Sequence, residues 1–256
     1  KTFEQRSIAK STQIYDRTGK ILLYDFHGDI KRTEISSSEM SSYVKSATVA
    51  IEDDKFYTNN GFRPLSFIRA ALVNITTGSY AQGGSTITQQ LVKLSFLTPE
   101  RTLKRKVSEL ILSLELEQQY SKQQILEMYL NKIFYGYQSY GIEAAAHTYF
   151  NKDAKSLTIA ESATLAGIPQ SPTRYSPYNN KEALMARQKY ILGRMHTLGL
   201  LNDAEFNKAS NDEIVFQPVR ASIRAPHFVF YILQELEKTY GEQIRGLNVY
   251  TSSDIN

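Results

Sequence analysis

The sequence lacks several residue types and patterns, and each absence excludes a class of function. It contains no cysteine, which excludes disulfides and thiol catalysis but leaves the cellular compartment open. The histidines are few and far apart in sequence, so no metal site is predicted from their spacing. They are His27, His147, His196 and His227. No apolar run reaches about 18 residues and no signal peptide is evident, so the chain as given is not expected to span a membrane.

The composition is that of an ordinary globular protein. The 256 residues are 41% hydrophobic and 22% charged, which is enough for one substantial core with small appendages. The net charge is +4 and the isoelectric point is near 9.0. This balance suits an anionic substrate, an acidic membrane surface or nucleic acid, and it does not choose among them. We expect no nucleic-acid partner, because the basic run RTLKRK lies in a leucine-rich helix with no recognised binding module around it.

Sequence patterns divide the chain into three parts. Residues 1–37 form an N-terminal flank in which residues 12–26 predict a β-hairpin. Residues 38–212 show helical spacing throughout, and three of their helices are expected to begin at capping boxes. The capping boxes are Ser121 with Gln124, Thr158 with Glu161, and Asn202 with Glu205. Residues 213–256 are expected to form a connector, with a helix over 226–240 and a strand at LNVYTS.

The stretch GGSTITQQLVK at 83–93 predicts a helix start that holds an anion. Two glycines let the backbone approach a ligand, Ser85 stands where an N-cap is expected, and a helix N-terminus offers free N–H groups to phosphate. Four polar side chains fall near one helix face at i, i+3, i+4 and i+7. They are Thr86, Gln89, Gln90 and Lys93. A solvated helix start is the alternative.

Two glutamates are candidates for acid–base chemistry. Glu52 ends a predicted helix next to the aromatic pair that includes Phe56, where a partly apolar cleft would raise its pKa as a general base requires. The alternative is a solvated helix end. Glu109 lies in a helix whose apolar residues predict burial almost all round, and Arg105 at i−4 offers a purely structural ion pair as its alternative role. Two carboxylates facing one cleft would suit glycosyl chemistry.

Cations close to these acids favour one kind of glycosyl chemistry. Lys93 and Arg101 lie eight residues apart across the Thr98-Pro99 break and are expected to converge on one phosphate group. A sugar that leaves from pyrophosphate needs positive charge to hold the departing anion, whereas a glycosidase must protonate an alkoxide. Glycosyl transfer from a phosphate is therefore favoured over hydrolysis.

The segment Leu65 to Ile75, LSFIRAALVNI, is apolar but too short to cross a membrane. It predicts either a helix that lies in a membrane interface or a buried core helix.

Five stretches, in this order, together resemble glycosyltransferase family 51, the peptidoglycan glycosyltransferase domain of class A penicillin-binding proteins and monofunctional transglycosylases. The resemblance runs from about residue 47 to 195, with looser flanks beyond it. The stretches are EDDKFYTNNG at 52–61, GGSTITQQLVK at 83–93, RKVSELILSLELE at 105–117, ILEMYLNKIFYG at 125–136 and LAGIPQSPTRYSP at 165–177.

The resemblance implies a mainly α fold, with a lysozyme-like helical head, a smaller membrane-associating jaw that includes 65–75, and a short β-hairpin at the N-terminal flank. It implies that lipid II is polymerised into β-1,4-linked glycan with inversion and release of undecaprenyl pyrophosphate. Glu52 matches the base, and Glu109 matches a second glutamate that organises the donor site. The positions that match the donor pyrophosphate site are Ser85, Gln90, Lys93 and Arg101. Positions with supporting roles are Asp53, Phe56, Thr86, Arg105 and Lys106.

The sequence departs from the family pattern at two positions. Asn59 stands where the family usually has histidine, and Leu94 stands where an asparagine is common. Asn59 can donate a hydrogen bond but does not titrate, so activity is expected to be lower if the histidine tunes Glu52. Alternatives to the polymerase are a lysozyme-like hydrolase or lytic transglycosylase, and an inactive module that binds lipid II.

The flanks also resemble those of bifunctional enzymes of this family. We expect a fragment of a longer protein that carries a membrane anchor and a transpeptidase domain. The expected location is the extracytoplasmic face of a bacterial cytoplasmic membrane, and the expected partners are lipid II, the growing glycan, the membrane surface and proteins of the division or elongation machinery. No cofactor is expected to be required; a divalent cation, Mg²⁺ or Mn²⁺, at the pyrophosphate is left open.

Overall fold

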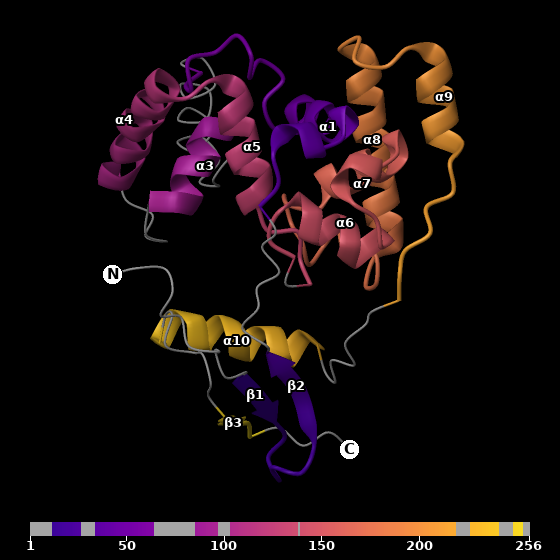
Figure 1. Cartoon of the computed structure of the whole chain (residues 1–256). Helices are drawn as coiled ribbons and strands as arrows, with labels where there is room; N and C mark the ends of the chain where they lie inside the picture. The colour runs from indigo at the N-terminus through magenta and orange to yellow at the C-terminus, as the bar shows by residue number, and fades with distance from the viewer. Residues whose placement is uncertain are drawn as a thin grey trace, which may run out of the picture. The chain divides into compact units, whose positions relative to one another are not determined.

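The protein is described by a computed structural model, shown in Figure 1. The residues that it describes are 12–26, 34–63, 85–96, 103–137, 139–218, 226–240 and 248–252. The chain divides into two compact units, of which one comprises residues 31–217 and the other combines residues 1–30 with 218–256. The two flanks that the sequence treats as separate segments thus contribute to one unit.

The smaller unit contains a three-stranded sheet and one helix. Strands β1 (Thr12–Tyr15) and β2 (Leu22–Phe26) pair antiparallel, and β3 (Asn248–Tyr250) pairs parallel to β1, which gives the order β2-β1-β3. Helix α10 (Pro226–Tyr240) belongs to the same unit. The predicted hairpin, helix and strand are confirmed. A two-stranded hairpin alone is marginally stable, and here the third strand and the helix help to bury its apolar face. The buried residues of this small core are Ile14, Leu23 and Val229.

The larger unit is helical in the parts that the structure describes, which confirms the mainly α prediction. Its elements are η2 (Ser37–Glu39), α1 (Ser42–Glu52), α3 (Ile87–Phe96), α4 (Leu103–Gln119), α5 (Lys122–Lys132), α6 (Ile142–Phe150), η3 (Ala154–Ser156), α7 (Ile159–Gly167), α8 (Lys181–Thr197) and α9 (Asp203–Asn211).

Three helices of this unit begin as the capping boxes predict. At α5, α7 and α9 the cap side chain accepts from the backbone of the third helical residue, whose side chain accepts from the cap backbone. These reciprocal bonds satisfy N–H groups that a helix start leaves without partners. The positions of these starts therefore follow from residues within one turn.

The helices pack as two groups around a shared core. Helix α1 packs against α7 and α8, while α3 packs against α4 and α5, and Figure 1 shows α3, α4 and α5 gathered together. The core is continuous across both groups, from Val44 of α1 through Leu91 of α3 to Leu192 of α8. Glu52 at the end of α1 is thereby brought to α3.

Helix α4 is less buried than its apolar sequence predicts. Val107 and Ile111 are each more than half exposed, and Leu114 is also exposed, so the prediction of burial almost all round is wrong. Glu109 and Ser113 lie on the side that faces the protein. A 17-residue helix with apolar residues on several sides can turn only one of them to the core.

Two features predicted from the sequence lie outside the described residues: the apolar segment 65–75 and the break at Thr98-Pro99. Among the described helices, none is long and apolar enough to cross a bilayer.

Candidate active site

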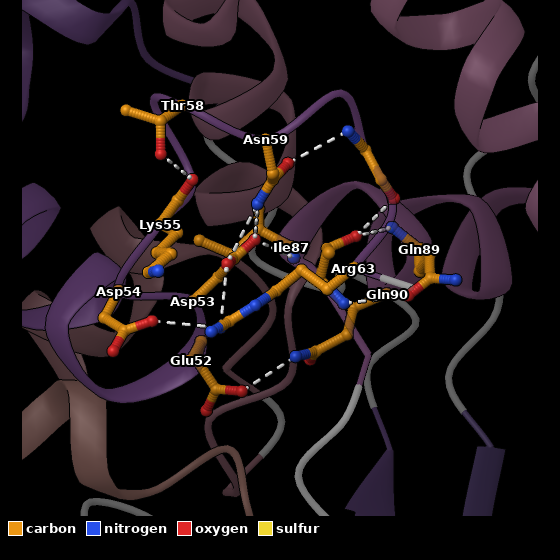
Figure 2. A network of polar contacts seen from close by, with 12 residues as sticks. Glu52, Asp53, Asp54, Lys55, Thr58, Asn59, Arg63, Ile87, Gln89 and Gln90 are labelled. Atoms are coloured by element: carbon orange, nitrogen blue, oxygen red, sulfur yellow. Dashed lines mark hydrogen bonds and ion pairs between the residues drawn. The ribbon is translucent and has the colours of Figure 1, made fainter. Parts of the chain in front are cut away.

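Glu52, the last residue of α1, is hydrogen-bonded to α3. Its Oε2 accepts from Gln90 Nε2 at 2.8 Å (Figure 2). The oxygen of the same amide accepts from the Tyr129 hydroxyl at 3.0 Å. Burial raises the pKa of Glu52, while the Gln90 hydrogen bond and the positive charge of Arg187 act against that rise. The side chain is only partly exposed, which is the setting predicted for a general base.

Two buried tyrosines lie in the field of this carboxylate. Tyr129 and Tyr135 are almost completely buried, and burial, with the negative charge of Glu52 as a lesser cause, raises the pKa of both hydroxyls. Tyr129 therefore stays protonated and keeps its hydrogen bond to Gln90. That bond fixes the oxygen of the amide and so turns its nitrogen toward Glu52.

Asp53 is held by a separate set of donors. Asn59 Nδ2 lies 3.0 Å from each carboxylate oxygen, and the backbone N–H of Ile87 donates to Oδ2 at 3.3 Å (Figure 2). Burial raises the pKa of Asp53 despite these bonds. Because Ile87 is the first residue of α3, Asp53 ties the end of α1 to the start of α3.

The hydrogen bonds of Asn59, which replaces the usual family histidine, lead to residues other than Glu52. Its Nδ2 donates to Asp53, and its Oδ1 accepts from the Gly61 backbone at 2.9 Å and from Lys122 Nζ at 3.2 Å. The replacement of histidine by Asn59 thus changes the hydrogen bonds within the loop that follows α1. Gly61 has a left-handed φ of +76° and lies against Glu117, where a Cβ would come within 2.7 Å of that side chain.

Two arginines that the sequence reasoning missed hold the acidic end of α1. Arg63 Nη1 lies 2.9 Å from Asp54 and 3.6 Å from Asp53 (Figure 2). Arg194 Nη2 of α8 lies 3.0 Å from the other oxygen of Asp54. These cations offset the charge repulsion among the acids and the unfavourable helix dipole at this end. Nothing in the spacing of either arginine marks it in the sequence.

Helix α3 begins one residue later than predicted. Its capping residue is Thr86, because Thr86 Oγ1 accepts from the Gln89 backbone at 3.1 Å and Gln89 Oε1 accepts from the Thr86 backbone at 2.9 Å. This is a capping box, and the N-cap expected at Ser85 is wrong. The sequence contained the signal, since threonine stands three positions before glutamine.

The four polar side chains expected on one face of α3 have different surroundings. Thr86 and Gln89 are buried in the cap, Gln90 reaches Glu52, and Lys93 is exposed to solvent. The hydroxyl of Thr86 also donates to the Gly61 carbonyl at 2.7 Å. Lys93 is therefore the member of the set best placed to meet a ligand from solution.

Glu109 of α4 is buried, and its carboxylate forms ion pairs with two cations. Lys106 Nζ lies 2.5 Å from Oε1, and Arg105 Nη1 lies 3.3 Å from Oε2. The predicted ion pair between Arg105 and Glu109 is confirmed. Lys106 is a second partner of Glu109 that was not predicted. Lys106 also donates to Ser85 Oγ at 3.3 Å, so this cluster links α4 to the segment just before α3.

Several predicted substrate contacts are fully buried. Phe56 has no exposed surface and lies under Lys122, whose Nζ is 4.7 Å from the ring centre. Asp53, Thr86 and Gln89 are also buried, with their polar groups engaged as described above. Their contact with substrate stays a prediction, and their burial favours a positioning role. Arg101 and the glycines at 83 and 84 lie outside the described residues.

Arg187 and Tyr129 are further site residues that the sequence reasoning missed. Arg187 Nε donates to the Gly167 carbonyl at 3.1 Å, and its guanidinium lies 5.0 Å from the ring centre of Tyr175. These contacts hold a charge that stabilises ionised Glu52. Tyr129 belongs to the stretch ILEMYLNKIFYG and could have been found from it, whereas Arg187 has no such signal.

Comparison with known proteins gives consistent matches. A family model described as transglycosylase matches residues 20–196. Penicillin-binding protein 2D of Bacillus subtilis (strain 168) is 41% identical over 255 residues, covering 96% of this chain and 37% of that protein. Penicillin-binding protein 1A of Aquifex aeolicus (strain VF5) is 36% identical over 258 residues, covering 100% of this chain and 35% of that protein. The chain thus spans about a third of the length of these relatives.

A crystal structure of penicillin-binding protein 1A from Haemophilus influenzae aligns over 96% of this chain and 27% of that one, with 24% identity and a TM-score of 0.48. The family match covers well over half of the chain, and the two relatives are more than 30% identical across nearly all of it. The chain therefore belongs to the transglycosylase family.

Proposed function

We propose that the protein is a peptidoglycan glycosyltransferase that polymerises lipid II. The observation that carries the proposal is the bond between Glu52 and Gln90, because it joins a carboxyl of raised pKa to the helix that bears Lys93. The family and the relatives named penicillin-binding proteins support the same reaction class.

Glu52 acts as the general base in this proposal. Its ionised carboxylate takes the proton from the 4-hydroxyl of the acceptor N-acetylglucosamine, and that oxygen attacks the anomeric carbon of the donor. The bond from the anomeric carbon to the pyrophosphate oxygen breaks, and the configuration inverts to give a β-1,4 linkage. A raised pKa makes the carboxylate a stronger base at the pH where it works, while Gln90 and Arg187 keep it ionised often enough to act.

The donor side stabilises the leaving pyrophosphate in this proposal. Lys93 is exposed on α3, and Arg101 is expected beside it from the sequence. Lys106 links Ser85 to Glu109, so the negative charge of Glu109 holds the Lys106 and Arg105 side chains in place. Fixed cations stabilise a departing anion without reorganising during the reaction.

A divalent cation at the pyrophosphate fits poorly with the acids that the structure describes. The two oxygens of Glu109 are engaged by Lys106 and Arg105, and those of Asp53 are engaged by Asn59 and Ile87. A metal ion would have to displace these donors to use either carboxylate. We therefore assign the charge stabilisation to the side chains.

The surroundings of the domain are also part of the proposal. The apolar segment 65–75 would associate with the membrane surface at the extracytoplasmic face, where lipid II and the growing glycan are presented. A transpeptidase domain, a membrane anchor and partners in the division or elongation machinery would belong to the longer protein. The relatives named penicillin-binding proteins, of which this chain spans about a third, support the proposal of a longer protein.

The test is to incubate the chain with labelled lipid II and separate the products by size. Glycan polymer and free undecaprenyl pyrophosphate are expected from the wild type. The Glu52→Gln variant should bind lipid II but make no polymer, since an amide cannot accept the proton.

Two other outcomes would replace the proposal. Cleavage of isolated sacculi without polymer formation would identify a hydrolase or lytic transglycosylase. Lipid II binding without turnover in the wild type, under conditions where a relative is active, would identify a binding module.

A further inference from the structure

Three side chains that the proposed reaction does not use converge beside helix α6. Glu143 and His147 lie one turn apart on α6, and Asp153 lies just after it, where it precedes η3. His147 Nε2 is 3.1 Å from Glu143 Oε1 and 3.3 Å from Asp153 Oδ1. All three ligand atoms lie within 4.8 Å of one another. One imidazole nitrogen thus faces two carboxylates.

The spacing suits a bound cation. Zinc bonds to nitrogen and oxygen are about 2.0–2.2 Å long, so two ligands of a tetrahedral ion lie roughly 3.3–3.6 Å apart. The two distances from Nε2 are close to this spacing. A hydrogen bond explains the arrangement less well, because Nε2 carries at most one proton and can direct it well toward only one carboxylate. A cation at the nitrogen can contact both.

The backbone fixes two of the three groups. The Ala154 N–H donates to Glu143 Oε2 at 2.8 Å, which leaves Oε1 turned to His147. Asn151 caps α6 in the left-handed conformation, with φ of 55° and ψ of 43°, and reverses the chain there. This reversal brings Asp153 back over the last turn of α6. Such outer hydrogen bonds orient ligands at metal sites.

We propose that Glu143, His147 and Asp153 bind a divalent first-row cation, and Zn²⁺ is the ion that fits best. An imidazole ligand favours zinc over Mg²⁺ and Ca²⁺, which take oxygen ligands. Two carboxylates balance the charge of the ion, and water would fill the fourth position. His147 and Asp153 are exposed, so the ion can enter from solvent.

The bound ion would stabilise the attachment of α6 to the start of α1. The Ala154 carbonyl accepts from the backbone of Ser41 at 3.2 Å, and Ser41 Oγ donates to the Leu157 carbonyl at 3.2 Å. Ser41 is the N-cap of α1, the helix that ends at Glu52. The ion would thus stabilise residues 153–157, whose carbonyl groups bind the N-terminus of α1. This role is structural.

The experiment measures Zn²⁺ binding to the chelator-treated chain by calorimetry and by thermal unfolding. One Zn²⁺ per chain is expected, with a rise in Tm of about 5–10 °C at a hundredfold excess over Kd. His147→Gln and Asp153→Asn should each weaken binding by roughly tenfold or more. Co²⁺ in place of zinc should give the visible absorption of a four-coordinate ion in the wild type and lose it in His147→Gln.

The chain offers a matched control in His196, which lies 2.7 Å from the single carboxylate Asp203. His196→Gln removes a similar histidine–carboxylate pair and should leave the binding and the Tm rise unchanged. The proposal is wrong if the wild type shows no Tm rise with Zn²⁺. It is equally wrong if the His147→Gln, Asp153→Asn double variant keeps the rise, because zinc is then bound elsewhere.

Discussion

Around Glu52 the site is assembled from neutral donors, whereas around Glu109 it is assembled from cations. Gln90 holds Glu52, and burial raises the pKa of this carboxyl. Glu109 is as buried as a core residue but has Lys106 and Arg105 on its two oxygens. The same residue type thus has the raised pKa of a candidate base in one place and forms ion pairs with two cations in the other. The difference lies in the partners, because an amide leaves a carboxylate basic and a cation compensates its charge.

The strongest test of this difference is to neutralise the base. Glu52→Gln should reduce lipid II polymerisation by about 10²–10⁴-fold, because the proton acceptor is lost. Initial rates on labelled lipid II measure it. Asp54→Asn is the control, since Asp54 is the exposed acid two positions on and is paired with Arg63 and Arg194. Equal losses in both variants would show that the charge of the cluster matters rather than the base.

The same variant should be more stable than the wild type at neutral pH. Burial raises the folded-state pKa of Glu52 above its unfolded value. The contribution of this side chain to the free energy of unfolding is therefore fully present below the unfolded pKa, and it is lost as pH rises through the folded pKa. Glutamine removes the cost of the buried charge. Thermal unfolding should show a Tm gain of about 2–4 °C for each kcal/mol at pH 7, shrinking toward pH 4. A gain that does not vary with pH would argue against this cause.

The donor side is tested by removing the exposed cation of α3. Lys93→Ala should lower kcat/KM by about 10²–10³-fold, because one fixed charge on the leaving group is lost. Lys93→Arg should keep most of the activity. Lys189→Ala removes an exposed lysine of α8 and is the control. If Lys93→Ala and Lys189→Ala behave alike, Lys93 has no role at the pyrophosphate.

A subtler test changes the partner of the base and keeps the base. Gln90→Leu removes the hydrogen bond that lowers the pKa of Glu52, so this pKa should rise and the acid limb of the pH–rate profile should move to higher pH. On the acid side kcat/KM should fall by about tenfold. Tyr129→Phe, which frees the amide of Gln90, should shift the limb in the same direction but less. An unmoved limb in both variants would assign the profile to another group.

The smallest effect on turnover is expected at Asn59. Asn59→Ala leaves buried Asp53 without its amide donor and should lower the free energy of unfolding by about 1–3 kcal/mol, measured by urea denaturation. Asn60→Ala, at the exposed neighbouring position, should change it little. A large loss of activity with unchanged stability would instead give Asn59 a direct part in the reaction.

Predictions from the sequence succeeded where the interaction is local. The capping boxes at Ser121 and Thr158, and the pair of Arg105 with Glu109, join residues three or four positions apart. Such contacts follow from the helix period alone. The N-cap predicted at Ser85 was wrong, although this interaction is also local. The pair of Thr86 with Gln89 offered the better capping box.

The prediction that α4 is buried almost all round failed. Periodicity shows which side of a helix is apolar, but it does not show how much of that side packs against the core. The prediction from histidine spacing considered the histidines alone. Spacing among histidines says nothing about carboxylates that a turn brings to one of them, as Asn151 brings Asp153 to His147.

The sequence by itself determined the helical class, the hairpin, most helix starts and the identity of the acids and cations. Only the tertiary structure decided their partners. Gln90 meets Glu52 across 38 residues, and Lys122 meets Asn59 across 63. Hydrogen bonds within a turn depend on the local backbone, whereas contacts between helices depend on how the whole core packs. The basic character of Glu52 belongs to that second kind, because its burial and its donors come from helices far away along the chain.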